Sequence, residues 1–210
     1  MIAVLDYGIG NLGSAYRALR AVGRDARIVH HPDEAVDAKG VVLPGVGNFG
    51  ACADALRRSG LDGVVRSAVH NERPLLGICV GLQLLYEDSE ESPRTAGLGI
   101  LQGSVHRLPG SLRLPQMQWN TVQRVANRSS VLLEQDEEPS WFYFVHAYAP
   151  VPDPGAASTV VGTCDYDGDV VAVVESGTCF GTQFHPEKSA QAGLALLSRF
   201  ADRCEQRVTT

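Results

Sequence analysis

Short, mainly apolar runs alternate with helical patterns in the first eighty residues, and this alternation limits the folds open to the chain. Four of these runs have the length of a strand: residues 2–5, 26–29, 41–43 and 74–78. The segments between them place apolar residues at helical spacing: residues 12–22, 49–58 and 61–71. Strands that are apolar on both faces and alternate with helices form a mainly parallel sheet with helices on both faces.

The pattern changes after about residue 98, where strand candidates follow one another with only turns or loops between them. These candidates are residues 100–108, 121–125, 142–148, 159–166, 170–175 and 179–184. Asp167-Gly168 is a typical hairpin turn, residues 89–94 and 150–157 are expected to be loops, and residues 189–204 form an amphipathic helix. The sequence therefore predicts an α/β fold with antiparallel additions in its C-terminal half.

Length and composition indicate one globular domain over residues 1–210, because no Pro/Gly/Ser-rich linker divides the chain. Apolar residues make up 44% and charged residues 20%, and the net charge of −6 argues against a nucleic-acid-binding protein. No apolar run approaches the roughly 20 residues of a membrane span. The N-terminus lacks the basic start of a signal peptide, which predicts a cytoplasmic protein. Five cysteines without CxxC spacing suggest neither a disulfide framework nor a zinc site.

The sharpest local motif follows the fourth apolar run, where the sequence reads Gly77-Ile78-Cys79-Val80-Gly81 and continues into a helical stretch at 82–86. A nucleophile in a strand-to-helix turn needs glycines two residues before and after it, because side chains there would collide with neighbouring backbone. The positive end of the helix dipole also favours the thiolate form of such a cysteine. The motif predicts Cys79 as a nucleophile, with a small buried hydrophobe as the alternative.

A cysteine nucleophile needs a base, and His185 and Glu187 are the candidates. In an extended segment, side chains two residues apart project from the same face, so Glu187 is expected to orient the His185 imidazole toward the thiol. A surface His-Pro-Glu turn is the alternative interpretation. Metal binding by Cys79, His185 and Glu187 has little support in their spacing, and no metal site is predicted.

A glycine-rich segment, Pro44-Gly45-Val46-Gly47, follows the third apolar run. Its glycines allow backbone N–H groups to turn toward a ligand, as an oxyanion hole requires. A P-loop is disfavoured because its Lys-Ser/Thr pair is missing, and a plain glycine turn is the other alternative. Residues 8–13 match Gly-x-Gly-x-x-Gly, but no acidic residue ends a strand about 20 residues later, which weakens a dinucleotide site.

Together these stretches resemble the class I, or triad, glutamine amidotransferases. The resemblance rests on residues 77–83 and on His185-Pro186-Glu187. Within that family, the opening Asp6-Tyr7-Gly8-Ile9-Gly10-Asn11, residues 44–47 and residues 181–189 resemble the glutaminase subunits of imidazole glycerol phosphate synthase. The resemblance extends from residue 1 to about residue 204 and implies a flavodoxin-like α/β fold.

The resemblance implies a glutaminase that works through a glutamyl thioester. Cys79 would attack the side-chain amide of glutamine, His185 would transfer protons and Glu187 would orient His185. Backbone N–H groups of Val46 and Val80 would hold the oxyanion. The residues implied to bind the substrate are Gly45, Gly47, Gln83, His146, Ala147 and Tyr148. From the sequence pattern alone, His146 is equally a histidine packed within a sheet.

The resemblance also implies a heterodimer with a cyclase subunit and no cofactor. Ammonia would pass to the cyclase, which makes imidazole glycerol phosphate and an aminoimidazole carboxamide ribotide in histidine biosynthesis. Asn11, Trp119 and Lys188 are the residues implied to face the partner. Two alternatives stay open: another triad glutaminase, such as that of pyridoxal phosphate synthase, and a non-catalytic regulatory protein on the same scaffold. An intact Cys/His/Glu set argues against the second.

Two positions depart from the family pattern. Gln118 stands in Met117-Gln118-Trp119-Asn120 where the family has glycine, and Ala147 stands where the family often has Ser or Thr. Neither departure touches the predicted triad, so they affect the expected pocket and interface rather than the reaction.

Overall fold

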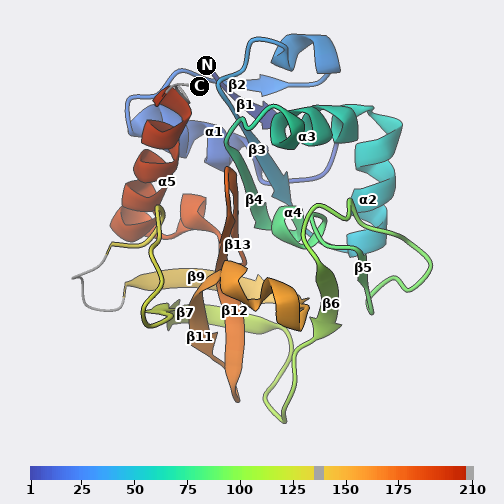
Figure 1. Cartoon of the computed structure of the whole chain (residues 1–210), viewed down its shortest axis with the longest axis vertical. Coiled ribbons are helices and arrows are strands. Elements are labelled where there is room, and N and C mark those ends of the chain that lie inside the picture. The colour runs from blue at the N-terminus through green and yellow to red at the C-terminus, as the bar shows by residue number, and fades with distance from the viewer. Residues whose placement is uncertain (135–139, 207–210) are drawn as a thin grey trace.

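The computed structural model describes residues 1–134 and 140–206 and is built around an eight-stranded sheet in the order β2-β1-β3-β4-β13-β12-β11-β8 (Figure 1). The strands are β1 (Ile2–Leu5), β2 (Ala26–Val29), β3 (Gly40–Gly45), β4 (Leu75–Cys79), β8 (Gln123–Arg124), β11 (Val160–Asp165), β12 (Asp169–Ser176) and β13 (Cys179–Thr182). The first five strands in that order pair in parallel and the rest pair antiparallel. The predicted sheet is thus confirmed.

Helices cover both faces of the parallel part of this sheet. They are α1 (Leu12–Ala21), α2 (Phe49–Arg58), α3 (Leu61–His70), the one-turn α4 (Val80–Gln83) and α5 (Ala190–Glu205). Figure 1 shows α1 and α5 on one side of the sheet and α2 and α3 on the other. Strands β1, β3 and β4 are buried along their whole length between these layers, and they form the centre of the apolar core.

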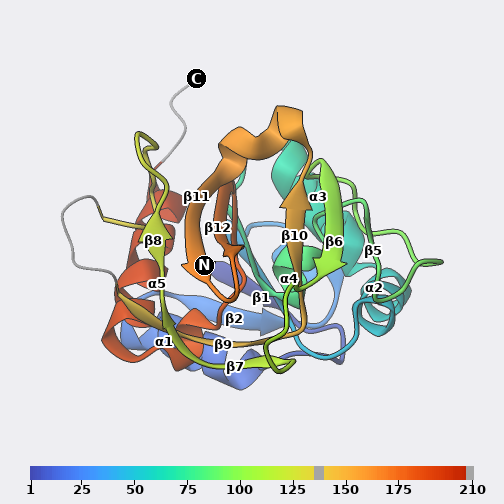
Figure 2. The ribbon, with the colours of Figure 1, turned by 90° about the horizontal axis from the view of Figure 1, so that it is seen from below.

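Two smaller sheets lie beside the carboxyl ends of the parallel strands (Figure 2). One has the order β10-β6-β5, and the other is a ribbon of two antiparallel strands, β7 and β9. Their bounds are β5 (Asp88–Ser89), β6 (Gly103–Arg107), β7 (Gln116–Thr121), β9 (Trp141–His146) and β10 (Tyr148–Pro152). The single strand predicted at 142–148 is therefore wrong: it is divided at Ala147 into β9 and β10, which belong to different sheets.

The loop predicted at 150–157 is also wrong, because β10 continues to Pro152 and a 3-10 helix, η2 (Pro154–Thr159), follows it. Pro150 and Pro152 suggested a loop because proline cannot donate to a strand ladder. An edge strand tolerates that loss. β10 is such an edge strand, paired on one side with β6.

Strand β7 was not predicted, although its sequence alternates polar and apolar residues. Its apolar residues, Met117 and Trp119, face outward and its partner β9 is distant in the sequence. Gln118 is exposed on the same strand, so the side chain that replaces the family's glycine does not enter the core.

Several segments end differently from the predictions at the carboxyl edge of the parallel sheet. β3 extends through Gly45 beyond the predicted 41–43, and β13 stops at Thr182 instead of Phe184. The helix predicted at 82–86 is α4, which begins directly after Cys79. These endings bring the Gly-rich segment, the cysteine and residues 183–185 to one edge of the sheet.

No helix within residues 1–134 and 140–206 is long and apolar enough to cross a membrane.

Glycine at position 81 is required by packing, which a comparison of two substitutions can test. A Cβ atom at Gly81 would overlap the Leu43 carbonyl, whereas a Cβ at the exposed Gly63 in α3 would meet nothing within 4 Å. We expect Gly81→Ala to lower the free energy of unfolding by about 3 kcal/mol. Gly63→Ala should raise it by roughly 0.5–1 kcal/mol. Urea unfolding measures both, and equal transition midpoints would contradict the packing argument.

Candidate active site

Cys79 is the last residue of β4 and immediately precedes α4. Its backbone has φ 54° and ψ −114°, a conformation that residues with a Cβ rarely adopt. A Cβ atom at Gly77 would lie 2.8 Å from the backbone of Gly81 and Leu82. Both flanking glycines are therefore sterically required, as the sequence motif predicts. The Cys79 side chain is buried at the start of the helix.

His185 lies beyond β13 and is held by hydrogen bonds at both its backbone and its ring. Its N–H donates to the Tyr143 carbonyl at 3.0 Å, and its Nδ1 donates to Glu187 Oε1 at 2.8 Å. Glu187 lies in a 3-10 turn, η3 (Pro186–Lys188), rather than in the extended segment that the sequence analysis assumed. The predicted His185–Glu187 pair therefore forms, but it is the 3-10 turn, and not an extended strand, that brings the two side chains together.

The environment of His185 favours its charged form. Burial disfavours the imidazolium, but the neighbouring Cys79 sulfur and the Glu187 carboxylate outweigh burial and raise the pKa of His185 to about 10. The side chains of His185 and Glu187 are both almost completely buried. A protonated imidazole beside a cysteine sulfur can supply a proton to a leaving group.

Gln183, which the sequence analysis missed, touches the cysteine sulfur, and its amide orientation follows from its neighbours. The Tyr148 carbonyl can only accept, so Gln83 must present Nε2 to it, at 2.8 Å. The same Nε2 donates to Gln183 Oε1 at 3.1 Å, which leaves Gln183 Nε2 to donate to Cys79 Sγ at 3.7 Å. The sequence signal that could have identified Gln183 is its position two residues before the predicted base His185.

Asn11 was predicted at the partner interface, yet its side chain reaches the triad. Its Nδ2 donates to Glu187 Oε1 at 3.2 Å, the oxygen that also accepts from His185. Asn11 directly precedes α1, at the end of the segment that follows β1. Asn11 therefore holds the Glu187 carboxylate, which in turn orients the His185 imidazole.

The Gly-rich segment lies against the cysteine turn. Gly45 ends β3 and pairs with Cys79 in the sheet register. A Cβ atom at Gly45 would lie 2.6 Å from the Gly81 nitrogen, so glycine is needed for this approach. Gly47 has φ +84° and open space around it. In the described chain no hydrogen bond engages the Val46 N–H. Val80, the second predicted donor, is the first residue of α4, so its N–H has no partner within that helix.

A cavity of about 690 Å³ opens in front of Cys79. It contains most of the predicted site residues, namely Val46, Gly47, Cys79, Val80, Gln83, His146, Ala147, Tyr148 and His185, with Asn11 and Lys188 also on its wall. Gly45 does not line it. The sequence analysis missed Gly10, Glu91, Pro115 and Val145. Glu91, which also accepts the Phe49 N–H at 2.7 Å, places a carboxylate in this wall.

His146, the last residue of β9, offers a hydrogen-bond acceptor to the cavity. Its Nδ1 donates to the Tyr148 carbonyl at 2.9 Å. Burial lowers the pKa of His146 to about 4, so the ring is neutral near pH 7 and its Nε2 carries a lone pair. That nitrogen is buried and has no partner in the described protein.

Trp119 and Lys188, predicted to face a partner, lie together on the outer face of the β7–β9 ribbon. The Trp119 ring packs edge-on against Tyr143, with centroids 6.1 Å apart. Lys188 Nζ lies 5.9 Å above the same Tyr143 ring. Trp119 is outside the cavity, whereas Lys188 reaches its rim.

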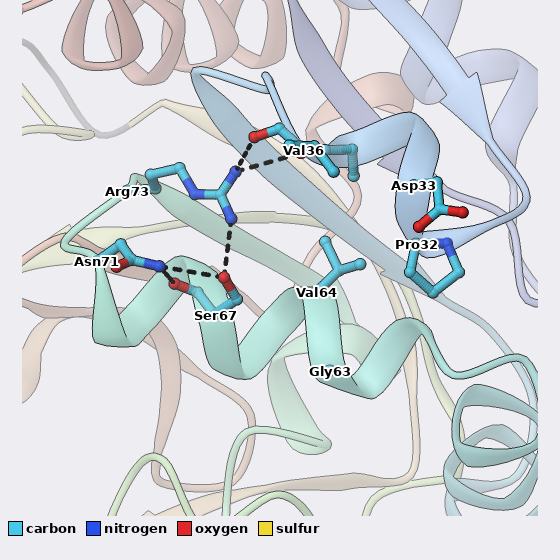
Figure 3. A pocket seen from close by; sticks show the side chains of 9 residues that line it. Pro32, Asp33, Val36, Gly63, Val64, Ser67, Asn71 and Arg73 are labelled. Carbon is cyan, nitrogen blue, oxygen red and sulfur yellow. Dashed lines mark hydrogen bonds between the residues drawn. The ribbon is translucent and has the colours of Figure 1, made fainter.

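A second cavity, of about 540 Å³, lies between η1 (Pro32–Ala35) and α3 (Figure 3). Arg73 crosses it and donates to the carbonyls of Ala35, Val36 and Ala38 and to Ser67 Oγ. The guanidinium thus ties η1 to α3 and is occupied by structural contacts. Across residues 1–134 and 140–206, no three His, Cys, Asp or Glu side chains are arranged to hold a metal ion.

Comparison with known proteins identifies relatives that are similar to this chain over nearly its whole length. Residues 3–204 match the family described as glutamine amidotransferase class-I. The imidazole glycerol phosphate synthase subunit HisH of Geobacillus thermodenitrificans is 45% identical over 206 residues, which cover 95% of this chain and 94% of that protein. The subunit of the same name from Symbiobacterium thermophilum is 46% identical over 199 residues, with 95% and 92% covered.

Solved structures share the fold at lower sequence identity. A crystal structure of a glutamine amidotransferase has a TM-score of 0.75 and 21% identity, with 97% of this chain and 98% of that chain covered. PurLQS from Thermotoga maritima also has a TM-score of 0.75, with 22% identity and 96% and 97% covered. With the match over residues 3–204 and the near-full-length relatives, the chain belongs to the class-I glutamine amidotransferases, in the group of imidazole glycerol phosphate synthase HisH subunits.

Proposed function

We propose that this chain is the glutaminase subunit of imidazole glycerol phosphate synthase, acting as one glutamine amidotransferase domain over residues 1–210. The observation that supports the proposal best is the buried Cys79, His185 and Glu187 constellation at the wall of a cavity of about 690 Å³. The HisH relatives, similar over nearly the whole chain, agree with it. The cytoplasmic location expected from the sequence stays a prediction.

The chemistry divides into two steps at the Cys79 sulfur. In the first, the thiolate attacks the side-chain carbonyl carbon of glutamine, and the C–N bond breaks as the His185 imidazolium gives its proton to the departing ammonia. In the second, His185 takes a proton from water as the water oxygen attacks the thioester. The C–S bond then breaks, which releases glutamate and restores the thiolate. Glu187 holds the ring in both steps.

The walls of the cavity suit the other groups of glutamine. The N–H groups of Val46 and Val80 would donate to the oxyanion that forms in each step. The Glu91 carboxylate and the lone pair of His146 Nε2 are acceptors, which suit the α-ammonium group of the amino acid. Gln183 donates to the sulfur that carries the acyl group.

The outer face of the β7–β9 ribbon suits the cyclase partner. Met117 is 65% exposed, Trp119 45% and Trp141 59%, and they lie with Tyr143 and Val145 on one face of two paired strands. An apolar face of this kind is typical of a protein interface. Val145 and Lys188 belong both to this region and to the wall of the catalytic cavity. A cyclase bound here would lie beside the place where ammonia is made.

Replacement of Cys79 tests the division of labour between the subunits. We expect Cys79→Ala to abolish glutamine-dependent synthesis by the complex while synthesis from free ammonia continues, because the thiol only makes ammonia. His185→Asn should behave similarly, and Glu187→Gln should lose less activity because it orients rather than transfers a proton. Both reactions are measured on the same complex. Full glutaminase activity in Cys79→Ala would refute the proposed function.

Lys188 tests the proposed interface, and the only other lysine provides a matched control. We expect Lys188→Ala to weaken binding of the cyclase subunit about tenfold, because a cation at the edge of the apolar face is removed. Lys39→Ala, an exposed lysine before β3, should leave binding unchanged. Isothermal titration calorimetry measures both affinities, and urea unfolding checks that folding is unaffected. Equal affinity and equal glutamine-dependent synthesis in the two variants would remove Lys188 from the interface.

The Gly-rich segment tests coupling between the subunits. We expect the isolated chain to hydrolyse glutamine slowly, and the partner with its nucleotide substrate to raise the rate at least ~10²-fold, the value of one oxyanion donor. Gly47→Val should blunt this stimulation, because valine disfavours φ +84° and so displaces the Val46–Gly47 peptide, which adjoins the one that carries the Val46 N–H. Gly177→Val carries a similar backbone penalty at φ +59° in the β12–β13 turn and should not blunt it. A fully active isolated chain would show that the segment is no switch.

A further inference from the structure

Two buried side chains that the reaction does not use contact the backbone of the Gly-rich segment. Tyr7 follows β1, and its hydroxyl donates to the Pro44 carbonyl at 2.7 Å. Cys52 lies in α2, and its Sγ donates to the Val46 carbonyl at 3.2 Å. Both side chains are buried, and the two also interact with each other. Tyr7 lies in the opening segment that contributes to the family resemblance, but the sequence analysis assigned no role to either residue.

Both groups remain hydrogen-bond donors near neutral pH. Burial, with a smaller contribution from Cys52, raises the pKa of the Tyr7 hydroxyl far above its usual value. Burial likewise raises the pKa of the Cys52 thiol. Each side chain therefore keeps its proton and can donate it to a backbone carbonyl, which only accepts.

The two carbonyls flank one peptide group. Pro44 C=O belongs to the peptide plane before Gly45, and Val46 C=O belongs to the plane that leads into Gly47. The plane between them consists of the Gly45 carbonyl and the Val46 N–H. That N–H makes no hydrogen bond in the described chain, so the two outer planes are held and the middle one retains a free donor.

Packing also restrains the α-carbon of Gly45. A Cβ there would lie 2.6 Å from the Gly81 nitrogen and 3.0 Å from the Tyr7 hydroxyl. The α-carbon thus has no room to move toward the cysteine turn. A rotation of the middle plane leaves both adjoining α-carbons in place and moves only the carbonyl oxygen and the N–H. Such a rotation turns the Gly45 carbonyl out of the register that Gly45 shares with Cys79, and it is the change that the packing leaves open to this segment.

We propose that Tyr7 and Cys52 are positioning residues that clamp the peptide planes on either side of Gly45–Val46 and so confine reorientation of the oxyanion donor to that single peptide. The inference rests on the proposed function, because the Val46 N–H matters only if an oxyanion forms at Cys79. Without the clamp, the outer planes also tilt and the N–H is aligned in a smaller fraction of molecules. The loss falls on the rate of the chemical step rather than on glutamine binding.

Kinetics of the complex with the cyclase subunit and its nucleotide substrate test the clamp. We expect Tyr7→Phe and Cys52→Ala each to lower kcat for glutamine hydrolysis about tenfold, part of the ~10²–10³-fold value of a whole oxyanion donor. KM should change less than twofold. Cys52→Ser restores a donor of similar size and should recover most of the lost kcat. The rate of Cys79 alkylation by iodoacetamide should stay unchanged in all three variants.

Two matched controls separate clamping from packing. Tyr86→Phe also deletes a buried hydroxyl, but the Tyr86 hydroxyl has no partner in the described chain. Cys204→Ala deletes a buried thiol in α5 at the opposite end of β3. Both controls should keep the wild-type kcat even if their unfolding midpoints in urea fall as far as those of the clamp variants.

The outcomes are distinguishable. Wild-type kcat in both Tyr7→Phe and Cys52→Ala overturns the clamp and leaves the proposed function standing. A loss in Cys52→Ala that serine does not recover, or an equal loss in the two controls, overturns it in favour of packing. Absence of glutamine hydrolysis in the wild-type complex overturns the clamp and the proposed function together.

Discussion

Close backbone contact between β3 and the turn after β4 is the constraint on which the rest of the site depends. Gly81 lies against the Leu43 carbonyl, and Gly45 lies against the Gly81 nitrogen. A side chain at either position would force the two segments apart. The contact also holds Cys79 at a positive φ, a conformation that costs about 1–3 kcal/mol and persists only where surrounding structure imposes it. The buried parallel strands supply that surrounding structure.

The same edge of the sheet gives two buried histidines opposite properties. His185 has Cys79 and Glu187 as neighbours, and these raise its pKa despite burial. Within the described residues His146 has the Tyr148 carbonyl as its one hydrogen-bond partner. Burial therefore prevails and, with a smaller contribution from the charge on His185, lowers the pKa of His146. Near pH 7 one ring is a proton donor and the other a neutral acceptor. The partners, rather than the depth of burial, assign these roles.

Local patterns predicted the parts of the fold whose burial is set by neighbours in the sequence. The parallel strands and helices α1, α2, α3 and α5 carry their own periodicity. The Gly-x-Cys-x-Gly spacing marks a local turn, although glycine is needed at position 81 because of the distant Leu43 carbonyl. The break at Ala147 and strand β7 depend on pairing between distant segments, which no local pattern records. The same is true of the contacts of Gln183 with Cys79 and of Asn11 with Glu187. The pairing of Glu187 with His185 was predicted from their spacing, whereas the approach of His185 to Cys79 was predicted from the need of a cysteine nucleophile for a base and from the family resemblance.

The segment from His185 to Lys188 joins the reaction to the proposed interface over a very short path. Glu187 orients the imidazole, and the next residue, Lys188, lies over the ring of Tyr143 on the outer face of the ribbon. The carbonyl of Tyr143 in turn accepts the backbone N–H of His185. A group that contacts Lys188 or Tyr143 is thus one residue or one hydrogen bond away from the triad. Coupling between a partner and this triad therefore needs no long chain of intermediate residues, because catalytic and outward-facing side chains share one turn.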